Sequence, residues 1–198
     1  MMENEWWIKD PNNYLILQFS DLFTEEELNS IVEMGEGLDR GTSTVHSLEG
    51  NFDTKVIKNI RNSSNTFIPV SDKSRWLFSK VSAIVNQVNA DYYNYDLTKL
   101  ESLQYAVYDE GGYYKDHLDL GLVPPAAYRK LSFTVQLSDD SDYKGGDLSI
   151  RLSNEPASAS RKKGDIFFFP SFLLHEVTEV TSGSRRSLVG WVHGPRFR

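Results

Sequence analysis

The sequence predicts an α+β protein of mainly β structure, in which helices from the first half buttress a jelly-roll (double-stranded β-helix) core in the second half. Helical periodicity of apolar residues is confined to the chain before residue 100. After residue 100, short apolar runs alternate with the turn-forming clusters DEGG, DDSDYKGG, KKGD and TSGSRR. These clusters are spaced too closely for helical crossovers between parallel strands, so a sandwich or barrel is favoured.

The length and composition indicate one domain, 1–198, since 198 residues suit a single large core and no Gly/Ser-rich linker divides the chain. We expect residues 1–99 to supply supporting helices and strands with a flap, and residues 100–194 to form the jelly-roll core. The net charge of -7 disfavours broad contact with nucleic acid. Without cysteine, any bound metal must be held by imidazole nitrogen and oxygen atoms.

The first half contains two predicted helices and one predicted strand. An apolar run predicts a strand over 14–19, and Thr24 with Glu27 forms a capping box for a helix over 25–35. A single apolar stripe predicts a second helix over 73–90. Residues 40–75 are rich in Ser, Thr, Asn and Gly without a period, which indicates irregular strands and loops and a flap over a substrate.

The second half contains seven apolar runs, each predicted to be a strand: 101–108, 113–118, 130–137, 147–152, 165–169, 172–178 and 186–193. No apolar stretch has the length of a membrane span, and the N-terminus lacks the pattern of a secretory signal. We therefore expect a monomeric cytoplasmic or other soluble intracellular protein without a membrane partner.

The stretch YDEGGYYKDHLDLG places His117 and Asp119 two positions apart, on one face if the chain is extended there. A solvated loop with a stray imidazole is the alternative for this pair alone. His175 is the best candidate for a third metal ligand, because it follows the apolar GDIFFFPSFLL, where an imidazole needs a partner. Alternatively, it is a core histidine bonded to a backbone carbonyl. His46 is expected in solvent and His193 at the surface or a pocket rim.

Two histidines and one carboxylate leave three positions open on an iron ion, the pattern of non-haem Fe(II) oxygenases. Zinc also accepts this ligand set. A bidentate oxo acid and dioxygen would fill the open positions, and the far carboxylate of the acid would need a fixed cation. Arg185, ten residues after His175 and beyond the turn TSGS, can return beside the metal through a hairpin. Arg186 is expected to face the opposite way and to be exposed.

Taken together, these features resemble the prolyl 4-hydroxylase-like branch of the Fe(II)/2-oxoglutarate-dependent dioxygenases. An arginine at the co-substrate position, where animal and plant relatives often have lysine, is more similar to bacterial or viral members. The resemblance is carried by YLILQFSDLFTEEELNSIV at 14–32, IRNSSNTFIP at 60–69, YDEGGYYKDHLD at 108–119, LSFTVQLSDDSDYKGGDLSI at 131–150 and KKGDIFFFPSFLLHEVTEVTSGSRRSLVGW at 162–191.

The resemblance implies roles for the metal and co-substrate residues. Iron would be ligated by His117, Asp119 and His175, and the distal carboxylate of 2-oxoglutarate would pair with Arg185. Tyr108 would hydrogen-bond the co-substrate, and Trp191 would form a wall of its pocket.

Three further positions follow from the same resemblance. Gln136 stands where some relatives have a tyrosine beside 2-oxoglutarate, and it is therefore a candidate for binding that co-substrate. Arg61 and Tyr114 are candidate contacts to the substrate, although a role in fixing its own loop suits Arg61 equally well.

The implied activity is hydroxylation of a C–H bond, with proline in a peptide or protein as the favoured target. It would use Fe(II), O2 and 2-oxoglutarate, which becomes succinate and CO2, with ascorbate as a reductant. A viral member would work in the cytoplasm of its host. The alternatives are an oxygenase acting on a free amino acid, another side chain or an alkylated base, and a cupin-type metal-binding module without turnover. Trp191 occupies the offset at which base-repair relatives have a second arginine, which disfavours the alkylated base.

Overall fold

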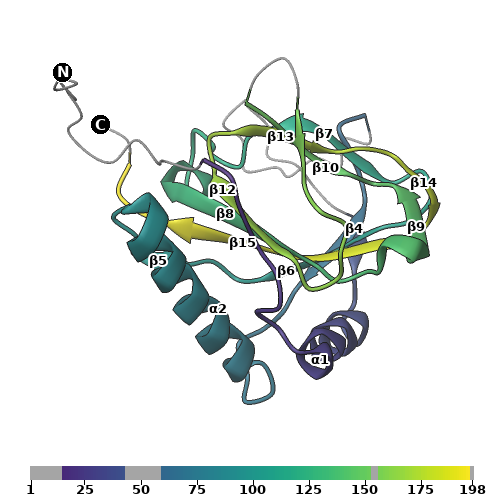
Figure 1. Ribbon diagram of the computed structural model, residues 1–198, viewed down its shortest axis with the longest axis horizontal. Helices are drawn as coiled ribbons and strands as arrows, with labels where there is room; N and C mark the ends of the chain where they lie inside the picture. The colour runs from purple at the N-terminus through teal and green to yellow at the C-terminus, as the bar shows by residue number, and fades with distance from the viewer. Residues whose placement is uncertain (1–14, 43–58, 153–155, 197–198) are drawn as a thin grey trace, which may run out of the picture.

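The computed structural model describes residues 15–42, 59–152 and 156–196. Within them, the structure consists of three layers (Figure 1). Two helices cover one face of a large antiparallel sheet, and a smaller antiparallel sheet lies on its other face. This arrangement confirms the predicted mainly β fold with buttressing helices.

Both predicted helices are present, with ends close to the predicted ones. Helix α1 spans Glu25–Glu36 and begins with the predicted capping box between Thr24 and Glu27. Helix α2 spans Arg75–Val88 and continues into a π-helical turn, Asn89–Tyr93. Two short 3-10 helices, Ala126–Tyr128 and Asp140–Asp142, lie in loops of the second half. The helices bury one apolar stripe each against the large sheet, as the periodicity predicts.

The large sheet has the order β1-β12-β8-β15-β6-β4-β2, with β5 paired to the end of β15. Its strands are β1 (Leu17–Phe19), β2 (Gly41–Thr42), β4 (Ser64–Phe67), β5 (Lys99–Leu100), β6 (Gln104–Tyr108), β8 (Arg129–Gln136), β12 (Ile166–Pro170) and β15 (Arg185–His193).

The small sheet has the order β11-β10-β13-β7-β3, and a separate pair, β14-β9, closes one end of the molecule. Its strands are β3 (Arg61–Asn62), β7 (Tyr113–His117), β10 (Leu148–Arg151), β11 (Ala157–Ser158) and β13 (Leu174–Val177); the pair consists of β9 (Tyr143–Gly145) and β14 (Val180–Gly183). All seven predicted strands of the second half are therefore present.

The prediction that DDSDYKGG and TSGSRR are only turns is wrong, because they contain β9 and most of β14, which pair with each other. Neither stretch has an apolar run, and glycines with positive φ, such as Gly145 and Gly183, bend the pair. The pairing is long-range, so no local pattern reports it.

The region 40–75 is partly tied into the sheets, because β3 joins the small sheet and β4 joins the large one. The predicted strands of this region are thus confirmed for 59–67, which is not a free flap. The rest of the predicted flap, 43–58 with His46, lies outside the described residues, as does Tyr14 at the start of the first predicted strand.

The two faces of β15 contain different side chains. Leu188 and Val192 pack with the helices in the main hydrophobic core. Alternating with them, four side chains face the small sheet and line a cleft: Arg185, Ser187, Val189 and Trp191. The period of two along this strand thus separates the core from the candidate site.

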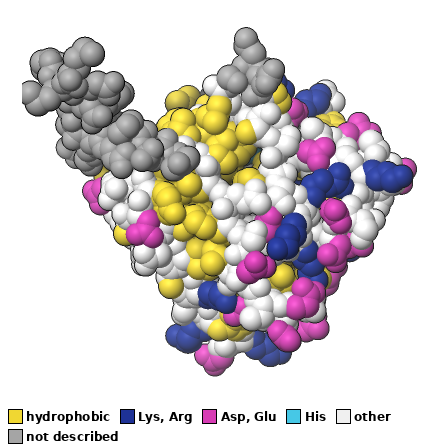
Figure 2. Space-filling model, in the orientation of Figure 1, with side chains coloured by type: hydrophobic (Ala, Val, Ile, Leu, Met, Phe, Trp, Pro, Cys, Tyr) yellow, Lys and Arg dark blue, Asp and Glu magenta, His cyan; other side chains and the backbone are white. Residues whose placement is uncertain are grey.

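The surface shows mixed charge. Acidic and basic side chains are interspersed over the β9–β14 side of the face drawn in Figure 2. Several of them form ion pairs, such as Arg161 with Asp147 and Arg151 with Asp116. None of the helices in the described part of the chain is long and apolar enough to cross a membrane.

Candidate functional site

A cleft between the two sheets contains most of the polar residues that the sequence singles out. It is open to solvent. Eight of the nine predicted site residues line it: Arg61, Tyr108, Tyr114, His117, Asp119, His175, Arg185 and Trp191. Gln136 is the exception.

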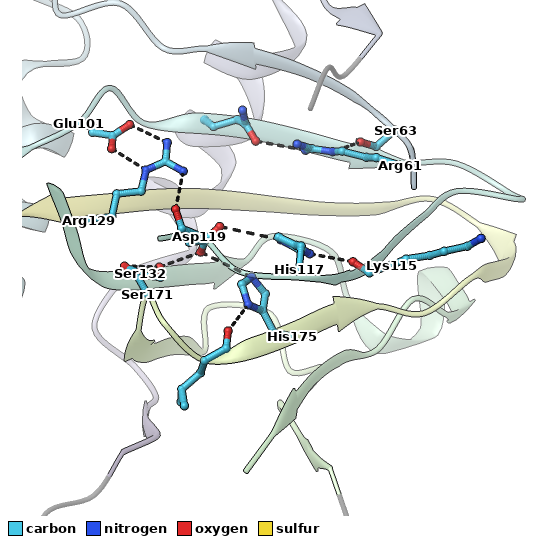
Figure 3. A network of polar contacts seen from close by, with 12 residues as sticks. Arg61, Ser63, Glu101, Lys115, His117, Asp119, Arg129, Ser132, Ser171 and His175 are labelled. Carbon is cyan, nitrogen blue, oxygen red and sulfur yellow. Dashed lines mark hydrogen bonds and ion pairs between the residues drawn. The ribbon is translucent and has the colours of Figure 1, made fainter. Parts of the chain in front are cut away.

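The register of the small sheet brings the two histidines together. His175 on β13 lies directly opposite His117 on β7. Two residues that are 58 positions apart in the sequence thus form one cross-strand pair. Asp119 follows two residues after His117, and its carboxylate oxygens lie 3.9 Å from Nε2 of His117 and 3.5 Å from Nε2 of His175. One ligand atom from each of the three residues lies within 4.8 Å of the others, and Figure 3 shows them converging.

Both imidazoles are oriented by the backbone. Nδ1 of His117 lies 2.8 Å from the carbonyl oxygen of Lys115, and Nδ1 of His175 lies 2.9 Å from that of Leu173. A carbonyl only accepts, so each Nδ1 donates its hydrogen and each Nε2 keeps a free lone pair. The two nitrogens nearest Asp119 are therefore the ones available to a metal.

The protonation states suit metal binding. Burial, together with the neighbouring His175, lowers the pKa of His117 to about 3, so this imidazole is neutral at physiological pH. Burial alone would raise the pKa of Asp119, but His175, His117 and Arg129 hold that pKa below its ordinary value. Ser132 also donates a hydrogen bond of 2.7 Å to Asp119 Oδ2, and it lies 2.9 Å from the hydroxyl of Ser171.

Two imidazoles and one carboxylate fit iron, because they would occupy one side of an octahedral ion and leave the other side for exogenous ligands. The ligand set also fits zinc.

Arg185 is a buried cation that has no carboxylate partner among the described residues. Its side chain lies in the cleft with 3% exposure, opposite Tyr108 in the pairing of β15 with β6. Its only hydrogen bond in the described part of the chain is a long one of 3.3 Å to Ser187, and its Cζ lies 5.6 Å from the centroid of the Tyr108 ring. A buried guanidinium in this state requires an anion.

Arg61 forms a stack with two other residues of the cleft. Its Cζ lies 4.6 Å from the Tyr114 ring centroid, and the Tyr114 ring stacks on His117 with centroids 3.4 Å apart. Hydrogen bonds to Ser63 and Gln104 hold the guanidinium, which has no carboxylate partner among the described residues. The loop-fixing role and a contact to substrate therefore coexist at Arg61.

The sequence did not single out Arg129, which joins the metal ligands to the pocket wall. Its guanidinium lies 3.9 Å from the Trp191 ring centroid, pairs with Glu101 at 2.6 Å, and donates to the backbone oxygen of Asp119 at 3.4 Å (Figure 3). The Nε1–H of Trp191 is buried without a partner in the described residues. A charged residue at the start of an apolar strand is the only sequence signal for Arg129, and it is a weak one.

Two predictions about position need correction. His193 is neither at the surface nor at the rim: it is 9% exposed and its Nε2 lies 2.6 Å from Glu101, because β5 covers the end of β15. Arg186 does face away from the metal, but it is only partly exposed, since it donates to Glu36 of α1 at 2.9 Å.

The second half of the chain is similar to known proteins. Residues 103–193 match the 2OG-Fe(II) oxygenase superfamily. A PKHD-type hydroxylase of Idiomarina loihiensis is 39% identical over 95 residues, which is 46% of this chain and 43% of the relative. In this alignment the chain thus spans less than half of the relative's length. A PKHD-type hydroxylase of Rippkaea orientalis is 26% identical over 184 residues, 90% of this chain and 78% of that protein.

A solved structure extends the similarity to the whole fold. A prolyl hydroxylase from Trichoplax adhaerens, in complex with a hypoxia inducible factor oxygen degradation domain peptide fragment, superimposes with a TM-score of 0.75. The match covers 92% of this chain and 84% of that one at 16% sequence identity. At this identity the likeness establishes the jelly-roll fold.

Proposed function

Because residues 103–193 form a domain of the 2OG-Fe(II) oxygenase superfamily, we propose that this protein is an Fe(II)- and 2-oxoglutarate-dependent dioxygenase that hydroxylates a C–H bond. The observation that carries the proposal is the position of Arg185. Its buried guanidinium, which no carboxylate of the described residues pairs with, lines the same cleft as the two histidines and Asp119. A dicarboxylate co-substrate would supply the missing anion while its oxo-acid end reached the metal.

The protein's contribution to this chemistry is ligation, orientation and protection from water. His117, Asp119 and His175 would hold Fe(II), and their contacts to Ser132 and the backbone would fix their geometry. When bound, iron supplies the activation of O2: one oxygen atom enters the substrate C–H bond, and the other enters 2-oxoglutarate as it becomes succinate and CO2.

The remaining residues of the cleft have proposed binding roles. Arg185 would bind the distal carboxylate of 2-oxoglutarate, with Tyr108 lying beside it in the register of the sheet. Trp191, held by Arg129, would form the wall of the pocket. Arg61 and Tyr114 would contact the substrate, because they line the cleft on the side of the His117 ring.

The favoured substrate is a proline residue in a peptide or protein. Two observations support this choice: the relatives are named PKHD-type hydroxylases, and the Trichoplax neighbour is a prolyl hydroxylase solved with a peptide fragment. The cleft is open to solvent, as the entry of one side chain of a longer substrate requires. A metal-binding module without turnover accounts for the triad but gives Arg185 no function.

The test is a peptide-library assay with Fe(II), 2-oxoglutarate and ascorbate under air. We expect a mass increase of one oxygen on proline-containing peptides, with succinate formed in equal amount. If oxygen is added only to residues other than proline, the prolyl assignment is wrong and the oxygenase assignment stands. A protein that binds Zn(II) after anaerobic purification, and that neither binds nor consumes 2-oxoglutarate, would overturn the proposal in favour of the metal-binding module.

A further inference from the structure

A second, smaller cavity lies on the other side of Arg185. It shares Arg185, Thr134 and Leu148 with the metal cleft. Its remaining lining is largely polar and includes Gln136 and Tyr143. The guanidinium of Arg185 therefore stands between the metal cleft and a polar chamber whose residues have no part in holding the metal.

Within this chamber, Gln136 and Tyr143 form one buried unit. Gln136 is 4% exposed and Tyr143 is 2% exposed, and Nε2 of Gln136 donates to the Tyr143 hydroxyl at 2.5 Å. The phenol oxygen accepts in this bond, so its own hydrogen remains available for another acceptor. No described residue accepts it. A buried hydroxyl with an unused hydrogen is suited to bind an anion.

The bare Cα of Gly146 shows how close Tyr143 and Arg185 are. A Cβ added at Gly146 would lie 3.2 Å from Cδ of Arg185 and 3.3 Å from Cε2 of Tyr143. The two side chains thus flank Gly146. Its φ of +66° and the lack of room for a Cβ both favour glycine at this position. The arginine and the phenol are adjacent walls of one small volume.

The Tyr143 ring is also held in place by Arg161, another residue that lines the chamber. Cζ of Arg161 lies 4.2 Å from the ring centroid, and the same guanidinium donates to the backbone oxygen of Tyr143 at 2.5 Å. Pairing of Tyr143 with Gly183 across β9 and β14 fixes the backbone. The hydroxyl is therefore positioned before any ligand arrives, which lowers the entropic cost of using it.

We propose that the Tyr143 hydroxyl donates a second hydrogen bond to the distal carboxylate of 2-oxoglutarate, beside Arg185, and that Gln136 is the positioning residue that aims it. This inference rests on the proposed function. It assigns Tyr143 to co-substrate recognition and replaces direct contact by Gln136 with an indirect role.

The experiment compares two ligands on the Tyr143→Phe variant. Fe(II)-loaded protein is titrated without O2 with 2-oxoglutarate and with 2-oxopentanoate, which has the same chain length but no distal carboxylate. Loss of a hydrogen bond to a charged group should weaken 2-oxoglutarate binding by about ten- to a hundredfold. The weaker affinity for 2-oxopentanoate should not change, because that ligand has no group for the hydroxyl to reach.

Tyr93→Phe is the matched control, because the Tyr93 hydroxyl is also buried and hydrogen-bonded. It lies away from the chamber, in the main hydrophobic core, where it donates to backbone oxygens of Leu15 and Phe168. It should leave both dissociation constants unchanged. If Tyr143→Phe weakens the binding of both ligands equally, or weakens the binding of neither, the inference is overturned. If the wild-type protein does not bind 2-oxoglutarate at all, the proposed function fails instead.

Gln136→Leu gives an independent test of the positioning role. It should weaken 2-oxoglutarate binding less than Tyr143→Phe does, and the double variant should be no weaker than Tyr143→Phe alone. Additive losses in the double variant would show that Gln136 contacts the ligand directly and would overturn the positioning role.

Discussion

Two adjacent arginines at the start of β15 have opposite environments. Arg186 faces the helices and donates to Glu36, which also accepts a hydrogen bond of 2.8 Å from Tyr105. Arg185 faces the small sheet and is more deeply buried, and its one hydrogen bond within the described residues is the long contact to Ser187.

The comparison separates groups that stabilise the fold from groups that await a ligand. A buried charge is costly unless it is paired, so the pairing of Arg186 with Glu36 is what a stabilising contact requires. The cleft instead keeps two cations, Arg185 and Arg61, without carboxylate partners in the described residues. Folding alone gives no reason for such groups, whereas binding of an anionic co-substrate or a polar substrate does.

The largest expected effect comes from removing the carboxylate of the cleft. Asp119→Ala should lose most bound Fe(II) and turnover while remaining folded, because it deletes a ligand at a strand end and leaves the core packing intact. Loss of a partner outside the ligand shell already costs about 10–100-fold, and loss of a ligand should cost more. Metal analysis, turnover and circular dichroism measure the three quantities.

Asp116→Ala is the matched control for that variant, since Asp116 lies on β7, three residues before Asp119, but pairs with Arg151 and is 40% exposed. Its iron content and turnover should match the wild type. An Asp119→Ala protein that still couples 2-oxoglutarate decay to hydroxylation would contradict the assigned metal site.

Next in size is the effect of Arg185→Ala on co-substrate binding. Breaking one side of a buried charge pair costs about 3–5 kcal/mol, so affinity for 2-oxoglutarate should fall by about two to three orders of magnitude or more. Iron binding should stay nearly intact. Arg185→Lys should retain part of the affinity, because it keeps the charge but loses the planar fork. Titration of 2-oxoglutarate into iron-loaded variants measures both.

Arg186→Ala should show the reverse pattern. Affinity for 2-oxoglutarate should be unchanged, while the free energy of unfolding should fall by about 1 kcal/mol through loss of the partly exposed pair with Glu36. Weaker 2-oxoglutarate binding in Arg186→Ala but not in Arg185→Ala would reverse the assignment of the two faces.

A smaller effect on the metal is expected from Ser132→Ala. Ser132 is fully buried and donates to Asp119, so its loss should reduce metal affinity by about 10–100-fold without removing a ligand. Ser138→Ala is the control, because Ser138 is also buried and hydrogen-bonded but lies at the other end of the sheet, bonded to Arg186 and Ser184. Equal metal affinity of the two variants would show that the Ser132 contact does not tune the site.

The smallest effect concerns the pH dependence of stability on the helix-covered face. Burial alone would raise the pKa of Glu36, but hydrogen bonds from Arg186, Tyr105 and Arg40 lower that pKa from 4.5 to about 2. Because the pKa of Glu36 is lower in the folded state, the ionised Glu36 stabilises the fold. This stabilisation is complete above pH 4.5 and is lost as the pH falls toward 2. Urea unfolding of wild type and Glu36→Gln should therefore differ most above pH 4.5 and converge toward pH 2. A constant difference across this window would show that the pair does not titrate with folding.

The sequence by itself determined seven strands of the second half, although not β9 and β14, and most of the residues that line the cleft. Alternating apolar runs and turn clusters are local signals, and they located all seven predicted strands. The two-residue spacing of His117 and Asp119 and the period of two along β15 are also local, so the metal pair and the facing of Arg185 followed from the chain alone.

The tertiary structure decided everything that depends on long-range register. The pairing of β7 with β13 sets His175 opposite His117, and the pairing of β9 with β14 brings Tyr143 to Gln136 from two stretches that resemble turns. Strand β5 pairs with the end of β15, where His193 is buried. Helix α1 supplies the carboxylate of Glu36, which pairs with Arg186. These contacts join residues far apart in the chain, and a local pattern of side chains contains no information about which distant strand will lie beside it.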